Sequence, residues 1–342
     1  MANSFFFLPF TISFVVAMAL LIFFIMLGKK NISKDDRISK RHSHGKGISR
    51  FGGVALIISF VIAIILDKNL FIDAPLLGVI ISCILILFFG VLDDIKQISW
   101  KIQLFLQSIV VLLIYIMGVK LTYITNPFGG ILLFDSGFGY VIGFIVSVIW
   151  IMFIMNAMNW IDGSDGIAGG VTLIGIISIF FLSLRPEVNQ PPIAIITMSI
   201  MGGLLAFIIF NFYPAKIMAG TSGANFMGFI LAVLAIFAGA KIATTLLVLV
   251  VPIVDALWVM LERSLAGKSI FLADKRHLHF KLSNMGWSSK KICLFYYGIT
   301  ALVAMIALNT NTIGKAWVFV FIIVTMTFFL ISLYRRKNIV NL

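Results

Sequence analysis

The segment 156–170, NAMNWIDGSDGIAGG, repeats a polar side chain at every third position between two long apolar runs. Its polar members are Asn156, Asn159, Asp162 and Asp165, and glycines stand at 163, 166, 169 and 170. Carboxylate and amide oxygens suit Mg²⁺, which takes one or two protein carboxylates and otherwise keeps waters or phosphates. Glycines let backbone approach a ligand closely, and a helix that begins near Ile167 would direct its first amides at an anion. The segment therefore predicts phosphate chemistry assisted by a divalent ion.

Four further segments carry groups suited to the same chemistry. Asp93 and Asp94 are adjacent, and on a helix their side chains diverge by about 100°, so one can hold metal while the other acts on a proton. The other three are HGKGISRFGG at 44–53, NFYPAK at 211–216 and LADKRHLHFKL at 272–282, which contribute the cations Lys46, Arg50, Lys216 and Arg276. Such cations could neutralise a pyrophosphate.

Each of these signals also has a plainer interpretation. A pair of aspartates at a helix end is often only solvated, and His277 and His279 could belong to an exposed basic loop. The glycine-rich segment is harder to explain in that way, because irregular backbone in a membrane protein occurs where it lines a cavity or is buried in protein.

The elements that must position these groups are membrane-spanning helices. Of the 342 residues, 61% are hydrophobic and 11% are charged, and the mean hydropathy is +1.13, which is outside the range of soluble proteins. Apolar runs such as GVALIISFVIAIIL do not alternate as barrel strands do. We predict an all-α integral membrane protein, a single domain over 1–342 with about 11 transmembrane helices. The predicted spans are 5–28, 48–66, 74–92, 102–119, 138–156, 167–184, 192–212, 224–240, 242–261, 291–308 and 316–334.

The distribution of basic residues predicts the orientation. With the N-terminus outside and the C-terminus in the cytoplasm, 21 of the 26 Lys and Arg residues fall on the cytoplasmic side, as the positive-inside rule requires. The cytoplasmic loops are then 29–50, 93–101, 157–166, 213–223 and 262–291. All the polar segments reach this one face, where a site close to the headgroups is expected.

The net charge of +13 is therefore mainly an orientation signal, and anionic membrane lipids are the expected partner of the basic surface. No nucleic-acid-binding module is recognisable, so a nucleic acid is not an expected partner. On the outer side, the glycine-rich segment 125–139 could form a small hairpin.

At these residues the chain resembles the polyprenyl-phosphate N-acetylhexosamine-1-phosphate transferase family, which includes initiators of O-antigen, enterobacterial common antigen and teichoic acid synthesis and, more distantly, the MraY translocase. The resemblance covers nearly the whole chain. NAMNWIDGSDGIAGG resembles N-x-x-N-x-x-D-G-x-D-G-L-A, HGKGISRFGG resembles H-x-K-P-x-P-R-x-G-G, and the DD pair resembles the family's paired aspartates. NFYPAKIMAGTSGANFMGF resembles N-x-x-P-A-K-x-F-M-G-D-x-G-S-x-x-x-G, and IFLADKRHLHFKL resembles I-F-x-x-D-x-x-H-L-H-H-x-L.

By that resemblance, the protein is an enzyme of the bacterial cytoplasmic membrane. It would transfer a sugar 1-phosphate, that of an N-acetylhexosamine, from a UDP-sugar to undecaprenyl phosphate and release UMP. The lipid phosphate would attack in line, with Mg²⁺, or alternatively Mn²⁺, as cofactor. The implied catalytic residues are Asp93, Asp94, Asp162, Asp165, His277 and His279; the implied substrate-binding residues are Lys46, Asn156, Asn211, Lys216 and Arg276; the implied metal ligands are Asn159, Asp94, Asp165 and Thr221.

Three positions depart from the family pattern. Thr221 stands where the family has a metal-binding aspartate, Met218 where an aromatic residue lies beside the uracil, and Phe280 where a histidine is usual. Loss of one carboxylate should weaken Mg²⁺ binding, although a hydroxyl or a water can take its place.

Two other classes of function stay open. A transporter would place its acids near the bilayer midplane, and inverted internal repeats would favour it. A catalytically impaired homologue would bind only nucleotide or lipid, and Thr221 is the residue that indicates it. A homodimer is one alternative for the assembly.

Overall fold

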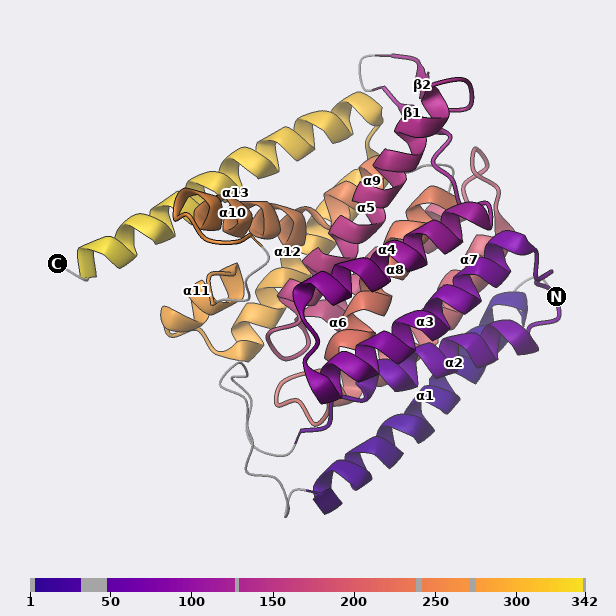
Figure 1. Cartoon of the computed structure of the whole chain (residues 1–342), viewed down its shortest axis with the longest axis horizontal. Coiled ribbons are helices and arrows are strands. Elements are labelled where there is room, and N and C mark those ends of the chain that lie inside the picture. The colour runs from indigo at the N-terminus through magenta and orange to yellow at the C-terminus, as the bar shows by residue number, and fades with distance from the viewer. Residues whose placement is uncertain (1–3, 32–47, 127–128, 238–241, 271–274, 341–342) are drawn as a thin grey trace.

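The computed structural model describes residues 4–31, 48–126, 129–237, 242–270 and 275–340, and nearly all of its regular structure is helical (Figure 1). The first helices are α1 (Ser4–Asn31), α2 (Gly52–Leu66), α3 (Ala74–Lys96), α4 (Trp100–Ile116), α5 (Gly139–Ile161), α6 (Ile167–Ser183) and α7 (Pro191–Asn211). They are followed by α8 (Gly220–Phe237), α9 (Ile242–Val248), α10 (Val250–Leu265), α11 (Leu278–Asn284), α12 (Ser289–Asn309) and α13 (Thr312–Val340).

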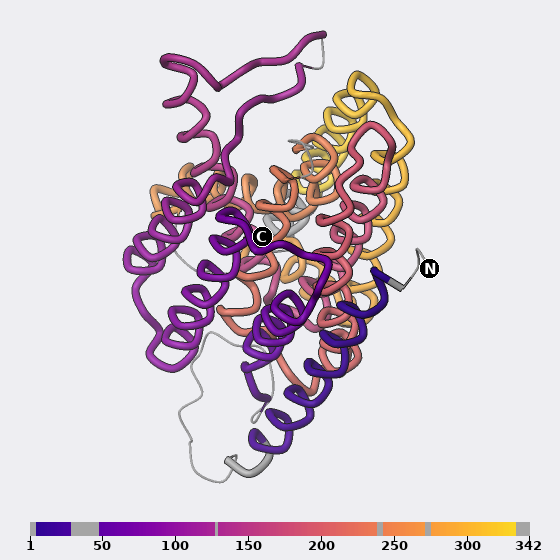
Figure 2. Tube along the Cα trace, turned by 90° about the vertical axis from the view of Figure 1, so that its right-hand side faces the viewer, coloured from indigo at the N-terminus to yellow at the C-terminus, as the bar shows by residue number. Residues whose placement is uncertain are grey.

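A small hairpin joins α4 to α5. Strands β1 (Tyr123–Thr125) and β2 (Ile131–Leu133) pair antiparallel, with Tyr123 opposite Leu133. The hairpin predicted at 125–139 is therefore confirmed, although its first strand begins two residues earlier. In Figure 2 it projects from one end of the molecule, and the described part of α1 ends at the opposite end.

Within the described residues, seven helices are long and apolar enough to cross a bilayer, namely α1, α3, α5, α7, α8, α12 and α13. An eighth span results if α9 and α10, which are bent by 75° at their junction, act as one. Helices α2, α4 and α6 are apolar but shorter. Because every predicted span overlaps one of these helices, the prediction of a polytopic all-α membrane protein is confirmed. The number of eleven spans and the orientation of the termini stay predictions.

Short polar residues define the starts of several helices. The Asp73 side chain accepts a hydrogen bond from the Leu76 backbone N at 3.0 Å at the start of α3, and Ser99 caps α4 in the same way. Between them, α3 ends at Lys96, because the next residue, Gln97, has a left-handed φ of +51°. The resulting tight connection brings the start of α4 back beside the last turn of α3.

Several helices extend into the predicted cytoplasmic loops 93–101, 157–166 and 213–223. Helix α3 continues to Lys96, α5 continues to Ile161 and α8 begins at Gly220. The loops are therefore shorter than predicted, because polar residues in a last helical turn lower the hydropathy without ending the helix. In the predicted loop 262–291, α10 continues to Leu265, α11 lies within the loop and α12 begins at Ser289.

Helix α8 lies at the centre of the bundle and packs against α2, α3 and α5. Of its apolar 18-residue window, 83% is buried inside the protein, compared with 17% for α1 and 11% for α13. The helices approach closely through small residues. A Cβ added to Gly53 would lie 2.0 Å from the Gly223 backbone N, and one added to Gly90 would lie 2.3 Å from the Ser222 Cα. Larger residues at these points would force α8 away from its neighbours.

Candidate active site

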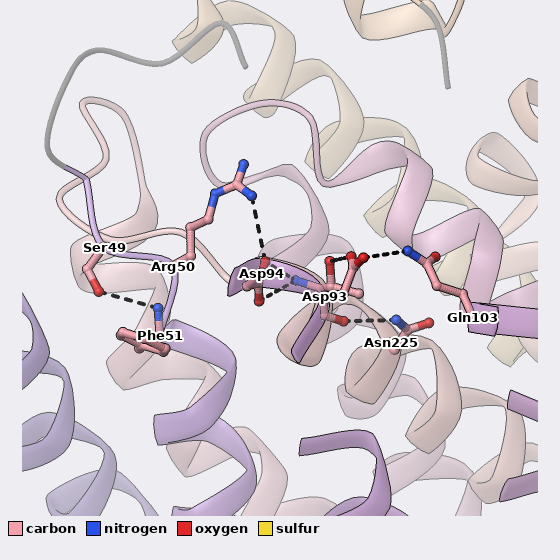
Figure 3. Close-up of polar contacts among 8 residues, drawn as sticks. Ser49, Arg50, Phe51, Asp93, Asp94, Gln103 and Asn225 are labelled. Atoms are coloured by element: carbon pink, nitrogen blue, oxygen red, sulfur yellow. Dashed lines mark hydrogen bonds and ion pairs between the residues drawn. The ribbon is translucent and has the colours of Figure 1, made fainter. Parts of the chain in front are cut away.

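The paired aspartates at the end of α3 meet the first turn of α8 (Figure 3). Both carboxylate oxygens of Asp94 accept hydrogen bonds from the Thr221 backbone N, at 3.1 and 3.0 Å. Asp93 accepts from the Thr221 hydroxyl at 2.6 Å and from Gln103 Nε2 at 2.8 Å. The start of a helix presents unpaired N–H groups and a positive dipole end, so it stabilises carboxylates there. One residue, Thr221, thus contacts both members of the pair.

Arg50 supplies a positive charge beside this pair. Its Nη1 lies 3.7 Å from Asp94 Oδ1, and its side chain is 34% exposed whereas that of Asp94 is 4% exposed. The turn that brings α8 to Asp94 requires glycine at position 220. Gly220 has a φ of +67°, and an added Cβ would lie 2.4 Å from Asp94 Oδ2.

Backbone pairing holds the Arg50 loop in place. The segment 48–53 runs beside 217–219 through an isolated parallel bridge between Ser49 and Ile217. The supporting bonds are Met218 N to Ser49 O at 2.8 Å, Gly52 N to Met218 O at 3.0 Å and Gly53 N to Ala219 O at 2.8 Å. Lys46, predicted to bind substrate, lies outside the described residues.

The Asn/Asp segment lies at the junction of α5 and α6. Asn159 and Asp162 are half-buried, on the last turn of α5 and at its end. Burial raises the pKa of the Asp162 carboxyl well above its ordinary value, the nearby Asp94 carboxylate raises it further, and Arg50 partly offsets both effects. Asp162 and Asp94 therefore lie close enough to interact, so the structure brings the segment and the acid pair together.

Asp165 is turned toward the next loop. It is 7% exposed, and its Oδ2 accepts a hydrogen bond from the Ala215 backbone N at 3.1 Å. Gly166, at a φ of +76°, begins α6, and its carbonyl accepts from the Tyr297 hydroxyl at 2.7 Å. Tyr297 of α12 therefore anchors the end of this segment by a hydrogen bond.

Asn211 connects the same two loops. It is 1% exposed, its Oδ1 accepts from the Gly166 backbone N at 3.1 Å, and its Nδ2 donates to the Ile217 carbonyl at 2.8 Å. This amide therefore fixes the loop geometry, and nucleotide binding by Asn211 stays a prediction. Lys216 is exposed and available to a ligand.

The two histidines are buried, which contradicts the alternative of an exposed basic loop. His277 is 3% exposed and His279 is 2% exposed. Their rings are parallel, with centroids 6.1 Å apart. A Cβ added to Gly163 would lie 2.5 Å from His279 Nε2, so the histidine ring packs directly on the Asn/Asp segment.

Asp255 of α10 holds His277 in place. Its Oδ2 lies 2.9 Å from His277 Nδ1, and its Oδ1 accepts from the Leu278 backbone N at 2.7 Å. Asp255 is 1% exposed. A carboxylate in this position favours the tautomer with hydrogen on Nδ1, which leaves Nε2 as an acceptor.

Two arginines lie in the same region, Arg263 on α10 and Arg276 just before α11. Arg263 lies with its Cζ 5.9 Å from the centre of the Trp160 ring, which is 5.8 Å from that of His277. Arg276, predicted to bind substrate, donates from Nη1 to the Glu262 carbonyl at 3.2 Å, at the end of α10.

Sequence reasoning missed Asp255, Gln103, Gln107, Asn225 and Tyr297. A signal existed for Asp255, because an acid inside an apolar run suggests function. The amides of Gln107 and Asn225 also stand within apolar runs, but their partners are remote in the sequence.

The donor set can be tested against a divalent ion. In the part of the chain that the structure describes, no three His, Cys, Asp or Glu side chains are arranged to hold a metal. Mg²⁺ does not need such a group, since one or two carboxylates with waters and ligand phosphates are sufficient. Asp94 and Asp162 repel one another, with Arg50 the neighbouring cation that offsets them. Two neighbouring acids of this kind are suited to bind a divalent ion. Asn159, three residues before Asp162 in the sequence, could add an amide oxygen as a metal ligand.

Comparisons with known proteins match the segments that form this site. A family model, Glycosyl transferase family 4, matches residues 76–239, which include the acid pair, the Asn/Asp segment and Thr221. A decaprenyl-phosphate N-acetylglucosaminephosphotransferase of Mycobacterium tuberculosis is 30% identical over 335 residues, covering 87% of this chain and 82% of the relative.

Two further relatives extend the comparison. A Bacillus subtilis protein described as a "probable undecaprenyl-phosphate N-acetylglucosaminyl 1-phosphate transferase" is 28% identical, covering 96% of this chain and 92% of the relative. A phospho-N-acetylmuramoyl-pentapeptide-transferase of Carboxydothermus hydrogenoformans is 28% identical, covering 78% of this chain and 86% of the relative. The chain belongs to the polyprenyl-phosphate N-acetylhexosamine-1-phosphate transferase family, within Glycosyl transferase family 4.

Proposed function

We propose that this protein transfers an N-acetylhexosamine 1-phosphate from a UDP-sugar to undecaprenyl phosphate, with release of UMP, in the bacterial cytoplasmic membrane. The observation that carries the proposal is the meeting of three carboxylates, Asp93, Asp94 and Asp162, with Arg50 at the start of α8. The names of the relatives support the choice of a polyprenyl phosphate acceptor and a hexosamine phosphate.

The residues would act on phosphate groups at the end of the helical bundle. Arg50 is partly exposed and can pair with an incoming phosphate in place of Asp94. Asp93 and Asp94 are held in defined orientations by Thr221 and Gln103, so either could accept a proton from the acceptor phosphate or orient it. His277, held by Asp255, can stabilise negative charge on the donor when it is protonated.

Asp94, Asp162 and Asn159 are the residues that would hold Mg²⁺. The bound ion would neutralise charge on the donor pyrophosphate and help to orient it. Burial, and after it the nearby Asp94 carboxylate, raise the pKa of Asp162 in the metal-free protein, and a bound cation would favour its ionised form.

An impaired homologue is the second candidate, and one observation favours it. The Thr221 hydroxyl, at the position of a family aspartate, donates to Asp93 at 2.6 Å. The Thr221 hydroxyl therefore gives this position an uncharged hydrogen-bond donor, whereas an aspartate there would add a negative charge that attracts a metal ion.

The experiment that separates the two uses purified protein in lipid nanodiscs with labelled UDP-N-acetylglucosamine, undecaprenyl phosphate and Mg²⁺. The proposed function predicts UMP release that requires the lipid phosphate. Asp93→Asn or Asp94→Asn should lower turnover at least about a hundredfold, the usual contribution of a general base. Asp135→Asn, an exposed position that follows the hairpin, is the matched control and should not change turnover. If UDP-N-acetylglucosamine and UDP-N-acetylgalactosamine both yield no UMP but either binds at equilibrium, the chain is an impaired homologue.

A further inference from the structure

A chain of hydrogen bonds, formed by side chains and by the backbone carbonyl of Thr221, runs from the acid pair to the Asn/Asp segment across four helices. It joins Asp93 of α3, Thr221 and Asn225 of α8, Gln107 of α4 and Asn156 of α5. The Thr221 hydroxyl donates to Asp93 at 2.6 Å, Asn225 Nδ2 donates to the Thr221 carbonyl at 2.9 Å, Gln107 Nε2 donates to Asn225 Oδ1 at 2.9 Å, and Asn156 Nδ2 donates to Gln107 Oε1 at 2.8 Å. Figure 3 shows the part of this chain that lies between Asp93 and Asn225.

The two central members are fully buried amides in apolar helices. Gln107 and Asn225 are both 0% exposed. Burial of an amide is unfavourable unless its polar atoms are bonded, and here the oxygen and the nitrogen of each side chain both have a partner. Two apolar side chains of similar shape could fill the same space with little loss of stability. Packing therefore does not explain the choice of these two amides.

Each end of the chain reaches a residue of the site. Asn225 bonds the carbonyl of Thr221 and so restrains the first turn of α8, which supplies the N–H group that binds Asp94. At the other end, Asn156 Nδ2 is occupied by Gln107 and by the Met152 carbonyl at 2.7 Å. Among the described residues the Asn156 oxygen has no such partner, so it is the atom of this amide that can accept a hydrogen bond from a ligand.

We propose that Gln107 and Asn225 are positioning residues that fix Asp93 and Asn156 relative to one another across the site. This inference rests on the proposed transfer reaction. Misplacement of reacting groups by about 1 Å can lower a rate by about a hundredfold, so a fixed separation has a kinetic effect far larger than its effect on stability.

The kinetic test compares Gln107→Leu, Asn225→Leu and the double variant, with Ser108→Ala on the exposed side of α4 as control. Each single variant should lower kcat at least about tenfold, with a KM for UDP-N-acetylglucosamine within about twofold of wild type. The single variants leave a buried amide without its partner and should also lower Tm, whereas the double variant removes both amides and should recover Tm. A merely structural pair would recover kcat together with Tm in the double variant, and that result would overturn the proposal.

A second measurement does not depend on turnover. The Tm shifts of Asp93→Asn and Asn156→Ala should be non-additive when Gln107 is present and additive in the Gln107→Leu background. Additive shifts in both backgrounds would show that the two ends are not connected, and the proposal would then fail. If wild type releases no UMP, the proposed function fails, and this comparison still decides whether the connection exists.

Discussion

Thr221→Asp tests how this site tolerates the aspartate that its family carries. The Thr221 hydroxyl lies 2.6 Å from Asp93 Oδ2, and the backbone N of Thr221 bonds Asp94. An aspartate at 221 would therefore bring a third carboxylate against the pair. The substitution also removes the hydroxyl donor that Asp93 now uses.

The magnitude follows from these contacts. At a separation of about 3.5 Å and an effective dielectric constant of about 20, two like charges repel by about 5 kcal/mol. Because Thr221 and Asp93 are both half-buried, water should screen this repulsion to about 1 to 3 kcal/mol. Loss of a hydrogen bond to a charged acceptor adds about 1.5 to 3 kcal/mol. Together these predict a metal-free loss of about 2.5 to 6 kcal/mol, or a fall in Tm of about 4 to 8 °C for a chain of this length.

The assay is thermal unfolding in a chelator and then in a Mg²⁺ titration, combined with UMP release. A bound divalent ion would offset the added repulsion, and a ligand at 100 times its Kd stabilises by about 2.7 kcal/mol. Thr221→Asp should consequently show a larger Mg²⁺-dependent rise in Tm than wild type and need less Mg²⁺ for half-maximal turnover. Thr221→Val is the matched control, since it removes the hydroxyl without adding charge and should show no larger Mg²⁺ response. Equal metal-free Tm and equal Mg²⁺ dependence in Thr221→Asp and wild type would refute the reasoning.

Three further outcomes are expected. For orientation, an impermeant thiol reagent applied to intact cells should label Ser136→Cys beside the hairpin but not Lys275→Cys. The two native cysteines are buried and should give little background labelling. The reverse labelling pattern would show that the predicted topology is inverted. Asp255→Asn keeps the size of the side chain but presents an amide to His277, and it should lower kcat about ten- to a hundredfold. Unchanged kinetics would contradict this role for Asp255. Because the folded state raises the pKa of Asp162 above its ordinary 3.8, it binds more protons than the unfolded state. The metal-free unfolding free energy should therefore decrease as pH rises above that value, and Asp162→Asn should flatten this dependence; parallel pH curves for both proteins would refute it.

The helices were predictable because hydropathy is a local property of the sequence. Their polar ends were predicted less well. Asp93, Asn159 and Thr221 lie on helical turns that extend into predicted loops, since a charged or amide side chain lowers hydropathy while the backbone continues its hydrogen bonding. The glycines of the Asn/Asp segment predicted a helix that begins near Ile167, and α6 does begin at Ile167, directly after Gly166 with its positive φ.

The contacts that make the site were not predictable from the pattern. Gln107 bonds an amide 118 positions away, and Asp255 bonds a histidine 22 positions away, directly before α11. Thr221 was placed by resemblance at a metal position, whereas its contacts with Asp93 and Asp94 depend on how α3 docks on α8. Such docking is set by packing of side chains and glycines over long sequence separations, which periodicity does not encode.

The burial of α8 has a consequence for the way this protein responds to its membrane. Lipids contact mainly the outer helices, because 83% of the apolar window of α8 is covered by protein whereas only 11% of that of α13 is covered. When bilayer thickness changes, exposed helices adjust by tilting, and a helix enclosed by protein has no direct contact with the acyl chains. Thr221 lies on that enclosed helix, and its hydrogen bonds hold Asp93 and Asp94 of α3 against it. Turnover should therefore vary little between nanodiscs made from lipids of short and long acyl chains, even where α13 changes its tilt.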